Sequence, residues 1–239
     1  MSNTAGARTL TIDIGGTGTK MIQLDAAGNA LGERLRQLTP RPATPTAVLA
    51  VIEQMLPQQS GYARVSVGFP GVVLAGVTKT APNLGTQHWR DVDLAAAITA
   101  LCGKPARVIN DADLQGYGAI RGVGVELALT LGTGLGAGLY VDGVLVPNLE
   151  LGHHPYGNGK TYEQRVSDAA LKRIGKKRFR KRVLKMLAQL QPFINYERIF
   201  IGGGNAKKLH ASALPANAHI FTNVEGMRGG ARLWRGGSR

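Results

Sequence analysis

The sequence predicts an α/β protein built as two lobes with a central cleft. The chain shows two β-rich segments, one in each predicted lobe, and each is followed by helical segments that could cover a sheet. Apolar residues make up 44% of the 239 residues, which is enough for a hydrophobic core. This length exceeds one ordinary domain of ~100–200 residues. We expect a small N-terminal lobe over residues 1–110, a large lobe over 111–223, and a last helix near 224–235 that packs back onto the first lobe.

Each element of the small lobe has a local signal. Strands are expected where short β-branched or apolar runs end at turn residues, and the first three would form an antiparallel meander. The predicted strands cover residues 10–14, 20–24, 29–38, 64–69 and 106–109. Helices are expected where apolar residues recur at helical spacing. The predicted helices cover residues 46–56 and 93–101.

The large lobe is predicted by the same signals. A helix at 111–120 begins at a residue that caps helices well. Paired strands follow, and Asp142-Gly143 is a hairpin turn signal. A polar loop then leads to two helices separated by Gly175. The predicted strands cover 127–131, 138–141 and 198–201, the loop covers 147–160, and the helices cover 161–174, 176–193 and 224–233.

The charge of the chain indicates an anionic partner. Lys and Arg total 29 against 15 Asp and Glu, a net charge of +14, which favours binding to a polyanion or a phosphate-rich molecule. The single cysteine, Cys102, excludes a disulfide framework and a Cys-rich zinc site. No signal segment is visible, and no apolar run reaches the ~18–20 residues that span a bilayer. We expect a cytoplasmic protein.

The first candidate motif follows the first predicted strand. It consists of an acid, a glycine turn, two hydroxyls and an ammonium, in Asp13, Gly15, Gly16, Thr17, Gly18, Thr19 and Lys20. Main-chain N–H groups in such a turn can hold phosphate oxygens, and the carboxylate can hold Mg²⁺ through water. The alternative is a plain β-hairpin whose turn needs positive φ.

A second glycine-rich motif covers residues 132–138. Its letters match a dinucleotide-binding pattern, but that pattern requires a helix to follow, and a strand is predicted here. A second phosphate loop inside a hairpin is the favoured interpretation, and a structural turn is the alternative. Its candidate residues are Gly132, Thr133, Gly134 and Gly136.

Two polar motifs could bind and activate a hydroxyl-bearing substrate. Asn110 and Asp111 follow a buried strand, where a carboxylate could accept a proton, although an ordinary helix cap explains one acid. Glu150, His153 and Glu163 lie in or next to the polar loop and could hold sugar hydroxyls, with exposed loop residues as the alternative. A metal site there is less favoured, because no further ligands have suitable spacing.

A strongly basic helix follows. Nine of the fourteen residues 172–185 are Lys or Arg, and no acid occurs between Asp168 and Glu197. Such a run is often just a solvated face. Uncompensated cations repel one another, however, and a bound polyanion would relieve that repulsion. The candidate residues for a polyphosphate surface are Lys176, Lys177, Arg178, Arg180, Lys181, Lys207 and Lys208.

In their order along the chain, these motifs resemble the ROK family of sugar kinases, and among them the polyphosphate glucokinases. The resemblance rests on residues 13–20, 70–71, 110–113, 132–138, 146–153 and 202–204, and on the proline-rich segment 39–45. It implies the actin-like, ribonuclease-H-like ATPase fold. It also implies transfer of a phosphoryl group from polyphosphate, with ATP as a second candidate donor, to the 6-hydroxyl of glucose or mannose in a homodimeric enzyme.

The resemblance assigns a role to each candidate. Asp111 would be the general base, and Asp13 would organise Mg²⁺. The glycine turns at 15–20 and 132–136 would hold the phosphoryl chain, and Gly202, Gly203 and Gly204 would meet the base and ribose of a nucleotide donor. The sugar would be held by Asn110, Glu150, His153 and Glu163, with Gly71 and Asn83 lining the same pocket.

One departure from the family pattern concerns zinc. Most ROK kinases carry cysteines after the Gly-His pair, and residues 155–160 contain none. We therefore expect no zinc, and the anchoring of Glu163 is left open. The alternatives are a strictly ATP-dependent sugar kinase of the same fold and a sugar-sensing or nucleic-acid-binding regulator. The regulator is disfavoured because no helix-turn-helix segment precedes Asp13 and few aromatic residues lie among the cations.

Overall fold

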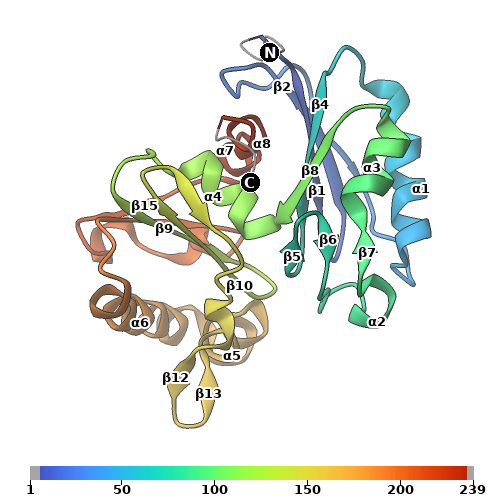
Figure 1. Ribbon diagram of the computed structural model, residues 1–239. Coiled ribbons are helices and arrows are strands. Elements are labelled where there is room, and N and C mark those ends of the chain that lie inside the picture. The colour runs from blue at the N-terminus through green and yellow to red at the C-terminus, as the bar shows by residue number, and fades with distance from the viewer. Residues whose placement is uncertain (1–5, 236–239) are drawn as a thin grey trace. The chain divides into compact units, whose positions relative to one another are not determined.

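The computed structural model describes residues 6–235, which belong to two compact units (Figure 1). Unit 1 is formed by the chain up to Gly118 together with the segment from Met227 onward, and unit 2 is Ala119–Gly226. The division therefore falls after helix α4 (Asp111–Ala119) and not before it, as the sequence had suggested. The reason is packing, because a Cβ atom at Gly68 would lie 3.0 Å from Cδ2 of Leu114 in α4.

Unit 1 contains a five-stranded mixed sheet in the order β3-β2-β1-β4-β8. The pairs β1–β2 and β2–β3 are antiparallel, whereas β1–β4 and β4–β8 are parallel. The expected third strand is much shorter than the predicted span 29–38. The strands are β1 (Thr9–Ile14), β2 (Thr19–Leu24), β3 (Leu35–Gln37), β4 (Arg64–Phe69) and β8 (Ala106–Asn110).

Helices cover both faces of this sheet. Alternation along β1 directs Leu10, Ile12 and Ile14 into a core shared with α1 (Pro45–Met55) and α3 (Leu94–Cys102). The other face lies under α8 (Gly229–Arg232), where a Cβ at Gly230 would overlap the Thr11 hydroxyl. This close approach explains a glycine at that position.

The segment after β4 forms small elements that the sequence did not predict. A three-stranded antiparallel sheet and one helical turn lie here. A further short helix, η1 (Leu56–Gln58), lies before β4. Trp89 is buried against Phe69, with ring centroids 4.8 Å apart, and its indole donates to the Ala43 carbonyl. The elements are β5 (Val73–Leu74), β6 (Val77–Thr78), β7 (Val92–Asp93) and α2 (Thr86–Trp89).

The chain returns to unit 1 at its C-terminal end, as the sequence led us to expect. The single helix expected at 224–233 is instead two short ones, α7 (Asn223–Met227) and α8. Trp234 donates from its indole to Ser66 Oγ at 2.8 Å, and that hydroxyl donates to the Gly230 carbonyl. The Arg107 guanidinium lies 4.4 Å from the Trp234 ring centroid. These contacts fix the segment on the sheet.

Unit 2 repeats the sheet plan of unit 1. Its order is β11-β10-β9-β14-β15, with two antiparallel pairs followed by two parallel ones. Residues 142 and 143 have φ of 50° and 78° and turn the chain from β10 to β11, as the Asp-Gly signal predicts. The strands are β9 (Val125–Leu131), β10 (Leu135–Val141), β11 (Val144–Val146), β14 (Arg198–Gly202) and β15 (Ala218–Ile220).

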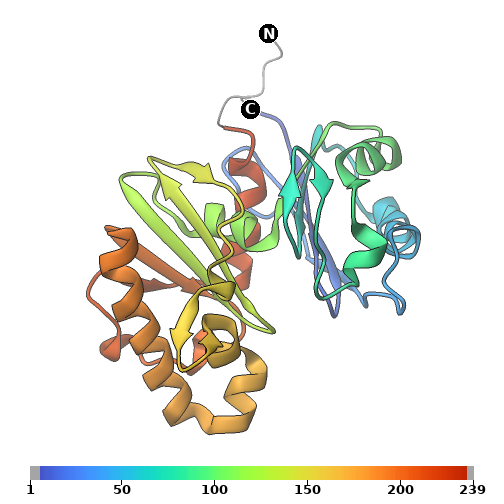
Figure 2. The same cartoon turned by 60° about the horizontal axis from the view of Figure 1, so that its bottom comes forward.

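Two helices pack on one face of the unit 2 sheet (Figure 2). Helix α5 (Tyr162–Val166) is short, because Ser167 ends it and caps α6 (Asp168–Ile194). Gly175 interrupts α6 with φ 75°, at the break that the sequence predicts. Short helices η3 (Ala206–Lys208) and η4 (Ala211–Ala213) precede β15. No helix within residues 6–235 is long and apolar enough to cross a membrane.

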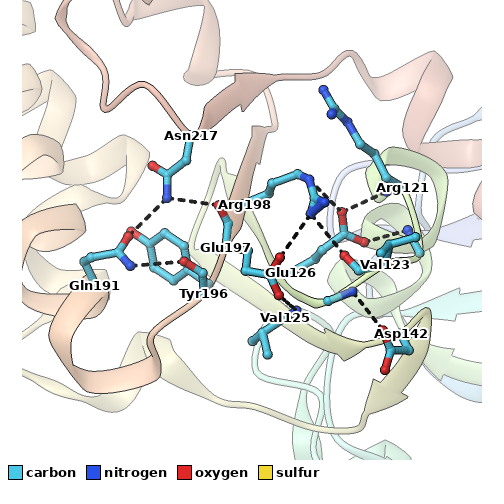
Figure 3. Close-up of polar contacts among 12 residues, drawn as sticks. Arg121, Val123, Val125, Glu126, Asp142, Gln191, Tyr196, Glu197, Arg198 and Asn217 are labelled. Carbon is cyan, nitrogen blue, oxygen red and sulfur yellow. Dashed lines mark hydrogen bonds and ion pairs between the residues drawn. The ribbon is translucent and has the colours of Figure 1, made fainter.

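A buried carboxylate near the start of β9 binds the segment that leads into this strand (Figure 3). Glu126 is fully buried, and its carboxylate accepts from the main-chain amides of Arg121 at 3.1 Å and Gly122 at 2.6 Å. Arg198 supplies the balancing charge, with Nε 3.9 Å from Glu126 Oε1. No sequence pattern indicates that an acid at position 126 would be buried.

We expect Glu126→Ala to destabilise the protein by about 3–5 kcal/mol, because it leaves Arg198 without its buried partner and two amides without an acceptor. Urea unfolding followed by circular dichroism measures the change. Glu197→Ala is the control, since that side chain is 57% exposed in its ion pair with Arg198 and should cost less than about 1 kcal/mol. Equal losses for the two variants would contradict this account.

Candidate functional site

The first glycine turn, Gly15–Gly18, joins β1 to β2 in unit 1. The Gly15 amide donates to the Gly18 carbonyl at 3.1 Å. None of Gly15, Gly16 and Gly18 has a left-handed φ, so positive φ does not explain why glycine occupies these positions. Space is the constraint, since a Cβ at Gly16 would lie 3.1 Å from that of Asn83, and one at Gly18 3.0 Å from Arg36 Nε. The turn thus offers main-chain groups without side chains to cover them.

Two residues that the sequence analysis did not assign to the site brace this turn. The Thr39 hydroxyl donates to the Gly15 carbonyl at 2.5 Å, and Arg41 donates to the Gly16 carbonyl at 2.9 Å. Both belong to the proline-rich segment that contributes to the family resemblance. Thr17 is exposed on the turn, whereas Thr19 is fully buried in β2 and its hydroxyl has no hydrogen-bond partner. The Thr19 side chain is therefore buried, and the phosphate contact expected at this residue stays a prediction for its main chain.

The acid and the ammonium of this motif form an ion pair. Asp13 and Lys20 face each other across β1 and β2, with Asp13 Oδ2 2.7 Å from Lys20 Nζ. Their side chains are 9% and 25% exposed. The pair thus lies at the end of the strands, next to the glycine turn. Within residues 6–235, no group of three or more His, Cys, Asp or Glu side chains could by itself hold a metal ion.

Asn110 and Asp111 connect β8 to α4. The Asn110 side chain donates to the Gly71 carbonyl at 3.1 Å and accepts from the Ala112 amide at 2.8 Å. Asp111 Oδ1 accepts from the same Ala112 amide at 2.8 Å, so both side chains take part in capping α4. Asn110 also fixes Gly71. No side chain fits at Gly71, because a Cβ there would overlap the Thr80 carbonyl.

Asp13 and the start of α4 share one face of the unit 1 sheet. Asp13 is paired with Gly68 in the parallel register, and paired residues point to the same face. A Cβ at Gly68 would lie 3.2 Å from the Asp111 Cα. Asn83 is exposed and touches Gly16. The structure therefore brings together the unit 1 candidates: Asp13, the turn 15–18, Lys20, Gly71, Asn83, Asn110 and Asp111.

The second glycine turn lies in unit 2 between β9 and β10. The Gly132 amide donates to the Gly134 carbonyl at 3.0 Å, and Thr133 is exposed. Gly136 lies within β10, opposite Thr130, and so outside the turn itself. The Gly132 carbonyl accepts from the Asp168 amide at 2.8 Å, which places the start of α6 beside the turn.

The glycine run after β14 packs against this same turn. A Cβ at Gly203 would lie 2.4 Å from the Leu131 carbonyl, and φ of Gly203 is +85°, so only glycine is accommodated there. Asn205 follows, and its main-chain amide donates to the Leu131 carbonyl at 2.9 Å while its side chain donates to Gly132 O at 3.4 Å. Asn205 is a site residue that the sequence analysis missed, although it directly follows the glycine run.

The three unit 2 candidates for sugar contact also lie together. Glu163 Oε2 accepts from the Leu135 amide at 3.1 Å, beside the second glycine turn. His153 Nε2 lies 3.7 Å from Glu150 Oε2, in and next to η2 (Leu151–His153). Burial raises the pKa of Glu150, His153 lowers it, and the nearby carboxylate of Glu163 raises it further. This is a small cluster of hydrogen-bonding groups beside the turn.

Aromatic packing holds residues 155–160, the segment where most ROK kinases carry cysteines. The rings of His154 and Tyr162 stack with centroids 5.0 Å apart, and Tyr156 meets Tyr162 edge-on at 6.0 Å. This packing joins the hairpin of β12 (Pro155–Gly157) and β13 (Lys160–Thr161) to α5. Thr161 and Gln164 form a capping box at the start of α5. Glu163 is thus positioned by aromatic contacts and a helix cap.

The basic residues of α6 and η3 lie on adjacent segments. The Arg180 guanidinium donates to the Lys208 carbonyl, which joins α6 to η3. Phe179, Val183 and Leu187 are buried against the sheet, so the cations occupy the remaining faces of the helix. Exposed cations on the two segments are Lys176, Lys177, Arg178, Lys181 and Lys207, and Arg180 and Lys208 are half-buried.

The paired glycine turns and the repeated sheet plan define an actin-like phosphotransferase fold. The ROK family model matches residues 9–177, and the chain belongs to the ROK family. It is 34% identical to the polyphosphate glucokinase of Mycobacterium tuberculosis (strain H37Rv), over 87% of this chain and 83% of that one. This confirms the resemblance inferred from the motifs.

Solved structures agree. The inorganic polyphosphate/ATP-glucomannokinase of Arthrobacter sp. strain KM superposes with a TM-score of 0.83 at 33% identity, covering 94% of this chain and 97% of that one. A ROK family glucokinase from Streptomyces griseus superposes with a TM-score of 0.78 at 21% identity, covering 97% of this chain and 100% of that one. At that identity the second likeness shows the fold alone.

Proposed function

We propose that this protein is a glucokinase that transfers a phosphoryl group to the 6-hydroxyl of glucose from inorganic polyphosphate or ATP. The observation that carries the proposal is the two glycine-rich turns, each beside polar groups suited to a sugar or a phosphate. Similarity to a polyphosphate glucokinase over most of both chains supports it. Phosphoryl transfer depends mainly on positioning and on neutralising charge, and these residues are suited to both.

Each unit supplies candidate side chains for hydrogen bonds to the sugar. Asp111 accepts the proton of the 6-hydroxyl as that oxygen attacks the phosphoryl group. Asn110 is positioned for a hydroxyl by its bonds to Gly71 and Ala112. In unit 2, Glu150, His153 and Glu163 are the candidates for further hydroxyls. Gly71 and Asn83 are the further candidates in unit 1.

Main-chain amides of each turn, residues 15–18 in unit 1 and 132–134 in unit 2, are candidates for binding phosphate oxygens, and Lys20 adds a cation next to the first turn. Asp13 suits a magnesium ion, because Mg²⁺ keeps several waters and needs only one or two carboxylates besides phosphate oxygens. One oxygen of Asp13 is paired with Lys20, so a single carboxylate acting through water fits this position. When bound, the ion would neutralise charge on the transferred phosphoryl group.

The donor is bound by unit 2. Residues 202–204 offer a glycine surface beside the second turn for a nucleotide. The basic residues of α6 and η3 offer charge to a longer polyphosphate chain. Mannose is a second candidate acceptor, because the similar Arthrobacter enzyme is a glucomannokinase. A homodimer, a cytoplasmic location and the lack of zinc stay predictions.

A coupled assay that crosses glucose and mannose with ATP and long-chain polyphosphate tests this proposal. We expect formation of the sugar 6-phosphate with both donors, abolished by removing Mg²⁺ with a chelator. Activity with ATP and none with polyphosphate would instead assign a strictly ATP-dependent kinase. No turnover with any pair would overturn the proposal.

A further inference from the structure

A second group of cations surrounds Tyr156 in unit 2, and the proposed reaction gives these cations no role. Arg165 of α5 lies with Cζ 5.7 Å from the Tyr156 ring centroid, and Lys185 Nζ of α6 lies 5.1 Å from it. The Tyr156 hydroxyl donates to the main-chain carbonyl of Arg182 at 3.3 Å. Arg165 and Lys185 therefore lie over one phenol ring. Burial raises the pKa of that phenol, and the charge of Arg182 lowers it.

The guanidinium groups of Arg165 and Arg182 each have a buried nitrogen without a hydrogen-bond partner. Arg165 Nε and Arg182 Nη1 are shielded from solvent and make no hydrogen bond. Burial lowers the pKa of Arg182 first, and the charge of Arg165 lowers it next. Arginine nevertheless keeps its proton in proteins, so both charges remain. In the described chain neither side chain forms an ion pair, since Asp168 is paired with Lys172 and Glu163 with the Leu135 amide.

Such an arrangement is costly in the free protein and favourable to an oxyanion. Buried donors are nearly always satisfied, and unsatisfied ones often mark a missing ion or ligand. Two planar guanidinium forks without a carboxylate match the oxygens of a phosphate group, which accepts paired N–H bonds. Arg173 and Arg178 add positive charge close to Arg182.

We infer that Arg165 and Arg182, flanked by Lys185, form an anchoring site for a phosphate group of a polyphosphate chain, apart from the site of transfer. Glu163 and Arg165 are two positions apart on α5, so they point to roughly opposite sides of that helix. Glu163 contacts the second glycine turn. The anchoring site thus lies on the side of α5 away from the second glycine turn. A phosphate chain that occupies the turn and the anchoring site together must be longer than a triphosphate.

This inference rests on the proposed function only for the identity of the polymer. Its test is therefore a binding measurement in addition to kinetics. We use Arg165→Gln, Arg182→Gln and the double variant, with Arg90→Gln as a control that removes one exposed charge from unit 1.

Calorimetry with long-chain polyphosphate should show about tenfold weaker binding for each single variant and no change for Arg90→Gln. The KM for long-chain polyphosphate should rise similarly, while KM for ATP and for tripolyphosphate stays within twofold. Without ligand, each single variant should unfold at the same temperature as the parent or higher, because like-charge repulsion is relieved.

Three results would overturn the inference. The first is unchanged polymer affinity in the double variant. The second is a fall in unfolding temperature, which marks a purely structural role. The third is equal calorimetric affinity of the parent for orthophosphate and for the polymer at equal phosphate concentration. If the enzyme proves inactive with polyphosphate while the variants still weaken its binding, the proposed donor is wrong and the anchoring site stands.

Discussion

Asp111→Asn should lower kcat by about 10²–10⁴-fold while leaving glucose affinity within about threefold. The amide has the same shape as the carboxylate but cannot accept the proton of the 6-hydroxyl, and this is the range that general-base catalysis contributes. Asn110, which fixes Gly71 and caps α4, is untouched by the change. Steady-state kinetics with ATP and calorimetric titration with glucose measure the two effects separately.

The matched control is Asp91→Asn, which makes the same chemical change in the same unit. The Asp91 carboxylate is 65% exposed and paired with Lys79. It should leave kcat unchanged. An Asp111→Asn enzyme within tenfold of the parent rate would remove Asp111 from the role of base. A loss of glucose affinity equal to the loss of rate would assign it to binding instead.

The KM for long-chain polyphosphate should rise about 50-fold between 50 and 200 mM salt, while KM for glucose changes less than twofold. The estimate takes about four phosphate contacts with the cations of α6 and η3 and a slope near −0.7 per contact for a single-stranded polyanion. Kinetics at four salt concentrations, with sodium chloride as the added salt, measure the slope.

Single variants locate these contacts. Lys176→Gln and Lys181→Gln should each reduce the magnitude of the slope by about 0.7, since each removes one released counterion. Arg90→Gln should leave it unchanged. A flat salt response in the parent enzyme would remove the basic face of α6 from donor binding, and a response that persists in the two Lys variants would move the contacts elsewhere.

The glycine motifs show how far sequence reasoning reached. Their positions at strand ends were predictable, because apolar runs and turn residues are local signals. The reason why glycine occupies these positions was not predictable. Glycine is required at Gly15, Gly16 and Gly18 by close neighbours such as Asn83 and Arg36 and not by positive φ. Those neighbours are fixed by strand pairing and loop packing. The structure also buries Thr19, which the motif alone placed with the phosphate ligands.

The duplicated sheet plan was invisible in the sequence. Both units order their strands with two antiparallel pairs followed by two parallel ones, yet no repeat of residues accompanies this. Strand order depends on which backbones pair and requires only that the buried positions be apolar. Different apolar residues satisfy the same plan, so the symmetry survives without matching letters.

The sequence by itself determined the chemistry available: Asp13 before the first glycine turn, Asp111 at the start of a helix, two glycine turns, a basic helix with a break at Gly175, and the family. Local conformation follows from nearest-neighbour sterics and hydrophobic period, which a sequence displays directly. Only the tertiary structure set Gly203 and Asn205 against Leu131 and Gly132, Glu163 against Leu135, and Arg165 near Arg182. Contacts between residues far apart depend on strand register and helix packing, and no local pattern encodes those.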